Sequence, residues 1–196
     1  MTYNELYERA GKPGFADFVE ESIRKGTMFP EITAQKNYTH NPNHHPEGSK
    51  EENGEIVPGT VLDHTLAALR DYHGNNPLVN MAILFHDFGK PMAAAPSENG
   101  NYHRFYNHDD IGAERFPEFA ERNGIPKEHQ DVFLFVIQNH MRFHHISEMK
   151  KKKIRKLKAS PFWNILKKVS YHDDHCRKWV FRKEAFRENI IRAKGC

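Results

Sequence analysis

Apolar side chains recur three and four residues apart along most of the chain, which is the period of an amphipathic helix. The stripe from Phe15 to Ile23 predicts a first helix that ends near Gly26. The same spacing predicts further helices at residues 60–73, 77–88, 108–122, 128–145, 161–174 and 179–191. No apolar alternation of period two is long enough to predict a strand of useful length. The pattern therefore predicts an all-α fold, a helical bundle.

Proline and glycine interrupt this pattern between Pro30 and Gly59, which predicts a long loop near residues 30–59. Loops of this length in a compact domain are usually functional or disordered. The loop contains His40, His44 and His45, which makes it a candidate contributor to a functional site.

The most apolar of the predicted helices contains a polar doublet, His86-Asp87, with Phe85 before it and Phe88 after it. A buried carboxylate costs several kcal/mol unless it is paired or bound to a metal. One interpretation is an aspartate that makes a structural hydrogen bond, and this requires a specific partner. Metal ligation supplies such a partner.

Histidine is frequent, with 14 residues in a chain of 196, and several histidines lie near the ends of predicted helices. His64, His108 and His140 are in such places, and Asp173 lies in the penultimate helix. Taken singly, each residue is typical of a cap, a surface position or a satisfied core position. The ordered set directs attention to metal chemistry.

His64, the doublet and Asp173 resemble the signature of the HD-domain metal-dependent phosphohydrolases, which is a His, a His-Asp doublet and a distant Asp. The resemblance is closest to the HD domains of bacterial CCA-adding tRNA nucleotidyltransferases. The matching segments, in the same order, are Phe29-Pro30-Glu31, His45-Pro46-Glu47-Gly48, His64-Thr65, residues 84–91, and His108 followed by Gly112-Ala113. The resemblance implies a single HD-type bundle at residues 29–196, with N-terminal helices at residues 1–28 packing on its core.

Two departures from that family change the expectations. Residues Ser49 to Gly59 look like an insertion before His64, which affects the geometry of the loop. The sequence contains no nucleotidyltransferase domain, so we expect no polymerising activity.

The resemblance implies that His64, His86, Asp87 and Asp173 bind a metal, with Asp174 as the alternative last ligand. His108 and His140 complete a second metal position bridged by Asp87, or contact the substrate phosphate if one metal binds. Imidazole and carboxylate ligands suit Mn, Fe, Co or Ni, and Mg is a further candidate. One or two such ions per chain are expected. Water bound to such a metal loses its proton near neutral pH.

Further site residues follow from the same resemblance. Lys90 is expected to contact a substrate phosphate, although a cation at a helix C-terminus is an equally weighted interpretation. His45 and Glu47 are candidates to supply the proton of the leaving group. Arg142 and His144 are weaker candidates for phosphate contact, because an exposed helix face explains both of them better.

Charge is divided unequally along the chain although the net formal charge is only +3. Residues 1–149 hold 13 basic and 22 acidic side chains, whereas residues 150–196 hold 16 and 4. The run from Lys150 to Lys158 places seven cations in nine residues. Such runs are typical of a solvated or disordered segment, and the alternative is a salt-dependent contact with a nucleic-acid backbone.

The combined prediction is a phosphohydrolase that acts on a nucleotide or RNA-end phosphate, including 2',3'-cyclic phosphates. The alternatives are a dinuclear-iron oxygenase with the same ligands and a catalytically silent RNA-binding or regulatory module. The longest apolar run, Val132 to Ile137, is far too short to span a membrane, and the polar start lacks a secretory signal. Cys176 and Cys196 form no disulfide framework. A cytoplasmic protein is therefore expected.

Overall fold

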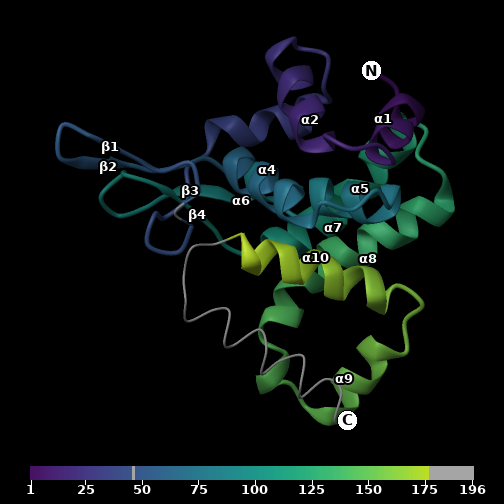
Figure 1. Ribbon diagram of the computed structural model, residues 1–196. Helices are drawn as coiled ribbons and strands as arrows, with labels where there is room; N and C mark the ends of the chain where they lie inside the picture. The colour runs from purple at the N-terminus through teal and green to yellow at the C-terminus, as the bar shows by residue number, and fades with distance from the viewer. Residues whose placement is uncertain (46, 177–196) are drawn as a thin grey trace.

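The computed structural model describes residues 1–45 and 47–176 as a helical bundle (Figure 1). The α-helices are α1 (Tyr3–Ala10), α2 (Phe15–Arg24), α3 (Pro30–Thr33), α4 (Val61–Tyr72), α5 (Pro77–Phe85), α6 (Lys90–Ala93), α7 (His108–Arg122), α8 (Lys127–His144), α9 (Lys151–Lys158) and α10 (Trp163–His175). Two short 3-10 helices, η1 (Ala34–Asn37) and η2 (Ile146–Glu148), accompany them. The predicted all-α class is confirmed. The predicted last helix, at residues 179–191, lies outside the described residues.

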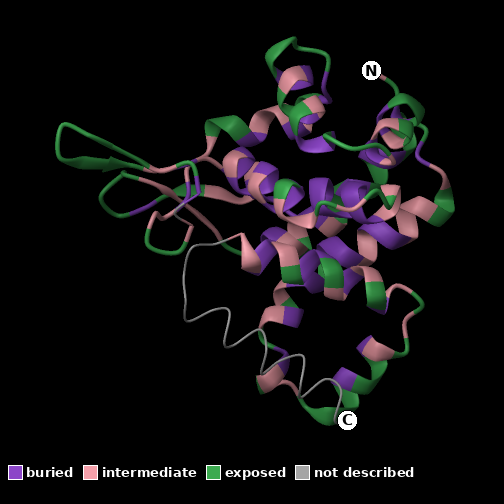
Figure 2. Cartoon of the chain, viewed as in Figure 1, coloured by how far each residue is buried: buried purple, intermediate pink, exposed green. Residues whose placement is uncertain are grey.

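Helix α5 forms the centre of the bundle and packs against α1, α4, α8 and α10. All its residues from Val79 to Phe85 are buried, as its nearly uninterrupted apolar sequence predicts. Figure 2 shows the buried residues concentrated on these inner helices. Buried side chains of α1 and α2, such as Leu6 and Val19, belong to the same apolar cluster. The division of the chain at residue 28 stays a prediction.

Local sequence signals explain where the two helices before the polar doublet begin. Thr60 and Asp63 form a reciprocal capping box at the start of α4. At α5 the Asn76 side chain accepts a hydrogen bond from the Val79 N–H, and Pro77 occupies the first turn. Both starts agree with the prediction from the sequence.

The chain contains two antiparallel hairpins, both too short for a period of two to be visible in the sequence. Strands β1 (Lys50–Glu52) and β2 (Glu55–Val57) pair within the predicted loop, which also contains α3 and η1. Strands β3 (Ala94–Pro96) and β4 (His103–Phe105) pair between α6 and α7. The hairpins project from the same side of the bundle (Figure 1). The predicted long loop near residues 30–59 therefore contains short helices and a hairpin.

Two helix boundaries differ from the prediction. Helix α5 ends at Phe85, so the doublet lies in the turn between α5 and α6 rather than inside a helix. Proline suits the first turn of a helix, so Pro91 helps to start α6. Helix α10 starts at Trp163, after the Ser160 hydroxyl accepts a hydrogen bond from the Phe162 N–H.

The basic run forms an amphipathic helix whose cations from Lys151 to Lys156 are exposed, so it is a solvated face rather than a disordered segment. Ile154 and Leu157 of α9 are buried in a second apolar cluster with Phe143, Ile146, Trp163 and Leu166. This burial stabilises α9 and leaves its cations on the outside. No helix among the described residues has the length and apolar character needed to cross a bilayer.

Candidate metal centre

Three helices bring the predicted ligands of the first metal together at the centre of the bundle. His64 comes from α4, the doublet His86-Asp87 from the turn after α5, and Asp173 from α10. All four side chains are almost completely buried. Nε2 of His64 lies 3.0 Å from Oδ1 of Asp173 and 3.8 Å from Oδ2 of Asp87. Nε2 of His86 lies 3.2 Å from the same Asp87 oxygen.

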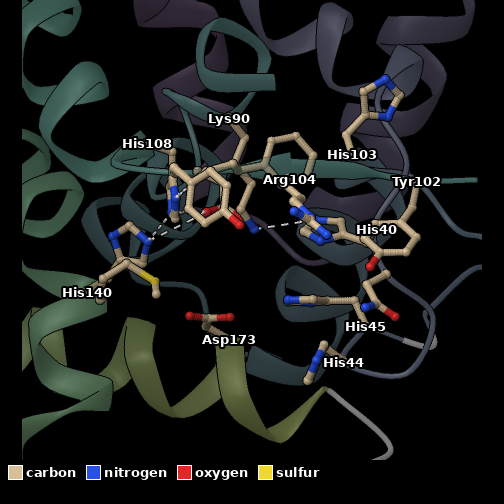
Figure 3. Close-up of a pocket in the computed structure, with 15 residues that line it drawn as sticks. His40, His44, His45, Lys90, Tyr102, His103, Arg104, His108, His140 and Asp173 are labelled. Atoms are coloured by element: carbon tan, nitrogen blue, oxygen red, sulfur yellow. Dashed lines mark hydrogen bonds and ion pairs between the residues drawn. The ribbon is translucent and has the colours of Figure 1, made fainter. Parts of the chain in front are cut away.

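The other oxygen of Asp87 faces a second pair of imidazoles. His108 is the first residue of α7 and His140 lies in α8. Their Nε2 atoms lie 3.4 Å and 3.6 Å from Oδ1 of Asp87. The two Nε2 atoms lie 3.1 Å apart (Figure 3). Asp87 therefore stands between two sets of ligand atoms, as a bridging carboxylate would.

Backbone carbonyls orient three of the four imidazoles. Nδ1 of His86, His108 and His140 lies 2.7–2.9 Å from the carbonyl oxygen of the residue three positions earlier. An Nδ1–H that donates to this carbonyl leaves Nε2 as the lone-pair nitrogen, and Nε2 is the atom that faces Asp87. The local backbone thus selects the tautomer that binds metal.

The donor atoms fit a divalent transition metal ion. Nε2 of His64 and Nε2 of His86 are buried and make no hydrogen bond with any described residue. Among the described residues, three groups of three potential ligand atoms are compact enough to hold an ion. Asp87 belongs to two of them, which are His64, His86, Asp87 and Asp87, His108, His140; the third is His45, Glu47, His64. Mixed imidazole and carboxylate donors are those that Mn, Fe, Co and Ni prefer.

The protonation states of Asp87 and His140 also favour cation binding. Burial alone raises the pKa of Asp87, but the neighbouring His86 and Lys90, with hydrogen bonds from His108 and His140, hold that pKa well below its usual value. Burial, together with the nearby His108 and His86, lowers the pKa of His140 to about 4. Asp87 is therefore ionised and His140 neutral at pH 7, which are the forms that bind metal.

The contact between α6 and α7 requires glycine at residue 89. A Cβ atom added to Gly89 would lie 2.0 Å from the His108 carbonyl oxygen and 2.6 Å from the Gly112 nitrogen. We expect Gly89→Ala to lower the free energy of unfolding by about 1–3 kcal/mol, because the α7 backbone must move. That movement carries His108 away from Asp87 and weakens metal binding.

Urea unfolding and metal titration check this expectation, with Gly11→Ala as the control because the nearest atom to its added Cβ is 3.5 Å away. Parent-like stability in Gly89→Ala would show that α6 and α7 do not depend on this close contact.

Lys90 is buried and lies beside Asp87 rather than at the carbonyl end of a helix. Its Nζ donates to Oδ2 of Asp87 at 2.5 Å and lies 3.4 Å from Nε2 of His40. The ammonium also lies over the ring of Phe105. This position agrees with the phosphate-contact interpretation, because Lys90 lines the cavity above the ligands.

An open cavity of about 400 Å³ leads to the predicted ligands. Figure 3 shows His108 and His140 on one side of it and His40, His45 and Tyr102 on the other. The cavity is also lined by residues that the sequence pattern did not single out individually as ligands or catalytic groups, namely His40, Asn41, His44, Tyr102, His103, Arg104, Phe105, Tyr106 and Met141. Most come from the loop or from the β3–β4 hairpin, where only the high histidine content offered a signal.

The remaining predicted residues divide into those at the cavity and those away from it. His45 lines the cavity, whereas Glu47 does not. Arg142 is half exposed, pairs with Asp110 at 3.7 Å, and lies away from the cavity as the exposed-face interpretation predicts.

His144 was expected on an exposed helix face, but it lies on the face of α8 that packs against α10. Nε2 of His144 lies 2.6 Å from Oδ2 of Asp173. Asp173 and Asp174 are both buried, but only Asp173 lines the cavity and pairs with His64.

Comparison with known proteins agrees with this geometry. The HD domain family model matches residues 60–178. A multifunctional CCA protein of Legionella pneumophila (strain Paris) is 31% identical over 96 residues, which are 48% of this chain and 22% of the relative. The same protein of Acinetobacter baumannii (strain ATCC 17978) is 28% identical over 144 residues, 72% of this chain and 29% of the relative. The chain thus spans less than a third of these relatives. It belongs to the HD domain family of metal-dependent phosphohydrolases.

Proposed function

We propose that this protein uses a divalent metal to hydrolyse a phosphate ester of a nucleotide or an RNA end, as a phosphatase or a 2',3'-cyclic phosphodiesterase. The observation that carries the proposal is the position of Asp87, whose two oxygens each face a pair of imidazoles beneath an open cavity. Such an arrangement holds one or two metal ions and leaves room for a phosphate.

The proposed division of labour follows from where each side chain lies. His64, His86, Asp87 and Asp173 hold a metal, and His108 with His140 holds a second one. A metal bound there would act as a Lewis acid and lower the pKa of its bound water to about 7. Lys90, beside Asp87, binds a phosphate oxygen. His45 is the proposed proton donor for the leaving group, because it lines the cavity whereas Glu47 does not.

The lining of the cavity supports an anionic substrate. Asp87 and Asp173 are the only acidic residues among the described residues that line it, and both are proposed ligands. Lys90, Arg104 and several imidazoles line the rest. The tyrosines of the β3–β4 hairpin add aromatic surface, to which a nucleobase can stack. The resemblance to the HD domains of CCA-adding enzymes favours a nucleotide or RNA end within this class.

A substrate screen tests the proposal. Nucleoside mono-, di- and triphosphates and nucleoside 2',3'-cyclic phosphates are each incubated with Mn²⁺, Co²⁺, Ni²⁺ or Mg²⁺, and released phosphate or ring-opened product is measured. Metal-dependent turnover of one class is expected. Oxygen consumption by the iron-loaded protein without phosphate release would favour the oxygenase alternative, and RNA binding without any turnover would favour the silent module.

Helix α9 is the proposed contact for an RNA backbone beyond the reacting phosphate. Its apolar residues are covered by the second cluster, and its cations from Lys151 to Lys156 are exposed. We expect replacement of Lys150 to Lys153 by alanine to raise the KM for an oligonucleotide and to spare a mononucleotide, which has no distal backbone. For single-stranded RNA, each lost phosphate contact should reduce the slope of the logarithm of the binding constant against the logarithm of the salt concentration by about 0.7.

The matched control removes four exposed cations from other elements, Lys12, Lys25, Lys36 and Lys127. Both variants lose the same charge, so a specific effect appears only in the α9 variant. Equal changes for oligonucleotide and mononucleotide would contradict a backbone contact, and unchanged kinetics for both would leave α9 as a solvated face.

A further inference from the structure

We propose that Glu47 is a positioning residue that holds the metal ligand His64 from behind, as the acceptor for its Nδ1–H, and that it does not touch the substrate. This inference rests on the proposed metal function and differs from the proton-donor role that the sequence suggested for Glu47. It also explains how the inserted segment between Ser49 and Gly59 is accommodated, since the two ends of this segment hold Glu47 in position.

His64 is the exception among the four imidazoles. The other three place Nδ1 against the carbonyl oxygen three residues earlier. For His64 that carbonyl belongs to Val61, and it accepts a hydrogen bond from the Thr65 hydroxyl at 3.1 Å. Side chains face the Nδ1 of His64 instead: Oε1 of Glu47 lies 3.6 Å away and Sγ of Cys176 lies 3.7 Å away.

Of these two side chains, the carboxylate is the stronger acceptor. The Cys176 thiol itself lies 3.6 Å from Oε1 of Glu47 as a donor, so it too points its hydrogen at the carboxylate. In the metal-bound protein we expect the 3.6 Å separation between Nδ1 of His64 and Oε1 of Glu47 to close to the length of a hydrogen bond. Carboxylate, imidazole and metal then form the triad that orients metal-bound histidines in proteins.

The loop is built to keep Glu47 at this place. A Cβ atom added to Gly59 would lie 1.8 Å from the carbonyl oxygen of Glu47. The backbone segments at residues 47 and 59 are therefore so close that only glycine fits at residue 59. The Gly59 N–H donates to the Ser49 hydroxyl at 3.1 Å. Gly59 directly precedes Thr60, the cap of the helix that carries His64. Backbone contacts therefore tie residue 47 to the start of α4.

The inserted segment, residues 49–59, extends away from the metal ligands, and its two ends are held together beside Glu47. Its strands β1 and β2 are exposed throughout, so the hairpin lies outside the core. The ends of the insertion meet beside Glu47, whose carboxylate is buried and absent from the cavity lining. The geometry thus places Glu47 behind a ligand and away from a leaving group.

The experiment measures affinity and stoichiometry for Mn²⁺ and Co²⁺ by equilibrium dialysis and metal analysis. We expect Glu47→Ala to lower the affinity about 10–100-fold with unchanged stoichiometry at saturation. Glu47→Gln, whose amide oxygen still accepts a hydrogen bond, should fall between Glu47→Ala and the parent. Glu52→Gln, on the exposed hairpin, and Cys176→Ala should bind metal like the parent. Thermal unfolding of the metal-free proteins establishes that each variant is folded.

Three outcomes would overturn the inference. Parent-like metal affinity in Glu47→Ala, with a lower kcat at saturating metal, would make Glu47 a catalytic residue. Loss of one ion per chain would instead show that His45, Glu47 and His64 hold a metal of their own, since their ligand atoms also lie close together. A parent protein that binds neither metal would overturn the proposed function itself, so the two failures are distinguishable.

Discussion

Asp87→Ala is expected to abolish metal binding and to reduce turnover by about three orders of magnitude or more. A bound metal contributes several kcal/mol of transition-state stabilisation, and each 1.36 kcal/mol corresponds to a factor of about ten in rate. Asp87 is the residue whose two oxygens face both pairs of imidazoles, so its removal affects both metal positions at once. Metal analysis, turnover and far-ultraviolet circular dichroism measure the outcome.

The same substitution leaves the buried ammonium of Lys90 without its carboxylate partner. Breaking a buried ion pair costs about 3–5 kcal/mol, so Asp87→Asn, which keeps the shape of the side chain, is the second variant. Both variants should keep the helical signal of the parent. Full metal content in either of them would contradict the assignment of Asp87.

Neighbouring positions provide the controls for this prediction. His64→Ala and His86→Ala should lose turnover as Asp87→Ala does, and the double variant of these two histidines should lose little more, because ligands of one ion act as a unit. Asp173→Ala should lose metal, whereas Asp174→Ala should retain it. Loss of metal in Asp174→Ala alone would reverse the choice between the two aspartates.

His108→Ala is expected to lower the metal content from near two ions per chain to near one. His108 and His140 face Oδ1 of Asp87, whereas His64 and His86 face Oδ2. Removing one imidazole from the first pair therefore leaves the other ligand set complete. Metal analysis after dialysis, at several metal concentrations, gives the stoichiometry.

His103→Ala is the matched control, because His103 also lines the cavity but its Nδ1 accepts a hydrogen bond from the Thr39 N–H at 3.1 Å. This variant should bind as much metal as the parent. If His108→Ala keeps its metal and only turns over more slowly, His108 instead contacts the phosphate or transfers a proton.

Local signals in the sequence predict most of the longer helices and the order of the polar residues that they bring together. Caps such as Thr60 with Asp63, and the apolar residues of α5, act within a few residues of the chain, so they can be read without a fold. The doublet was detectable because a buried aspartate among phenylalanines needs a partner. The resemblance to HD domains then connected residues far apart in the sequence, and the family match confirms it.

Tertiary packing determines which of the neighbouring residues line the cavity and which lie behind the ligands. Arg142 and His144 lie two residues apart on α8, so they point about 200° apart around its axis. The packing of α8 on α10 turns His144 to Asp173 and leaves Arg142 at the surface. No local pattern reveals which face a neighbouring helix will cover.

The two hairpins and the arrangement of the loop at residues 30–59 could not be predicted from local sequence patterns either. Strands of three residues have too few alternations to be recognised, so the cavity wall formed by the β3–β4 hairpin was not predicted. His45 and Glu47 are close in sequence, yet His45 lines the cavity and Glu47 lies behind His64. The close contact of Gly59 with the Glu47 backbone keeps Glu47 behind His64 and out of the cavity. Residues 47 and 59 meet only because the loop between them folds back, and no local sequence pattern predicts this contact.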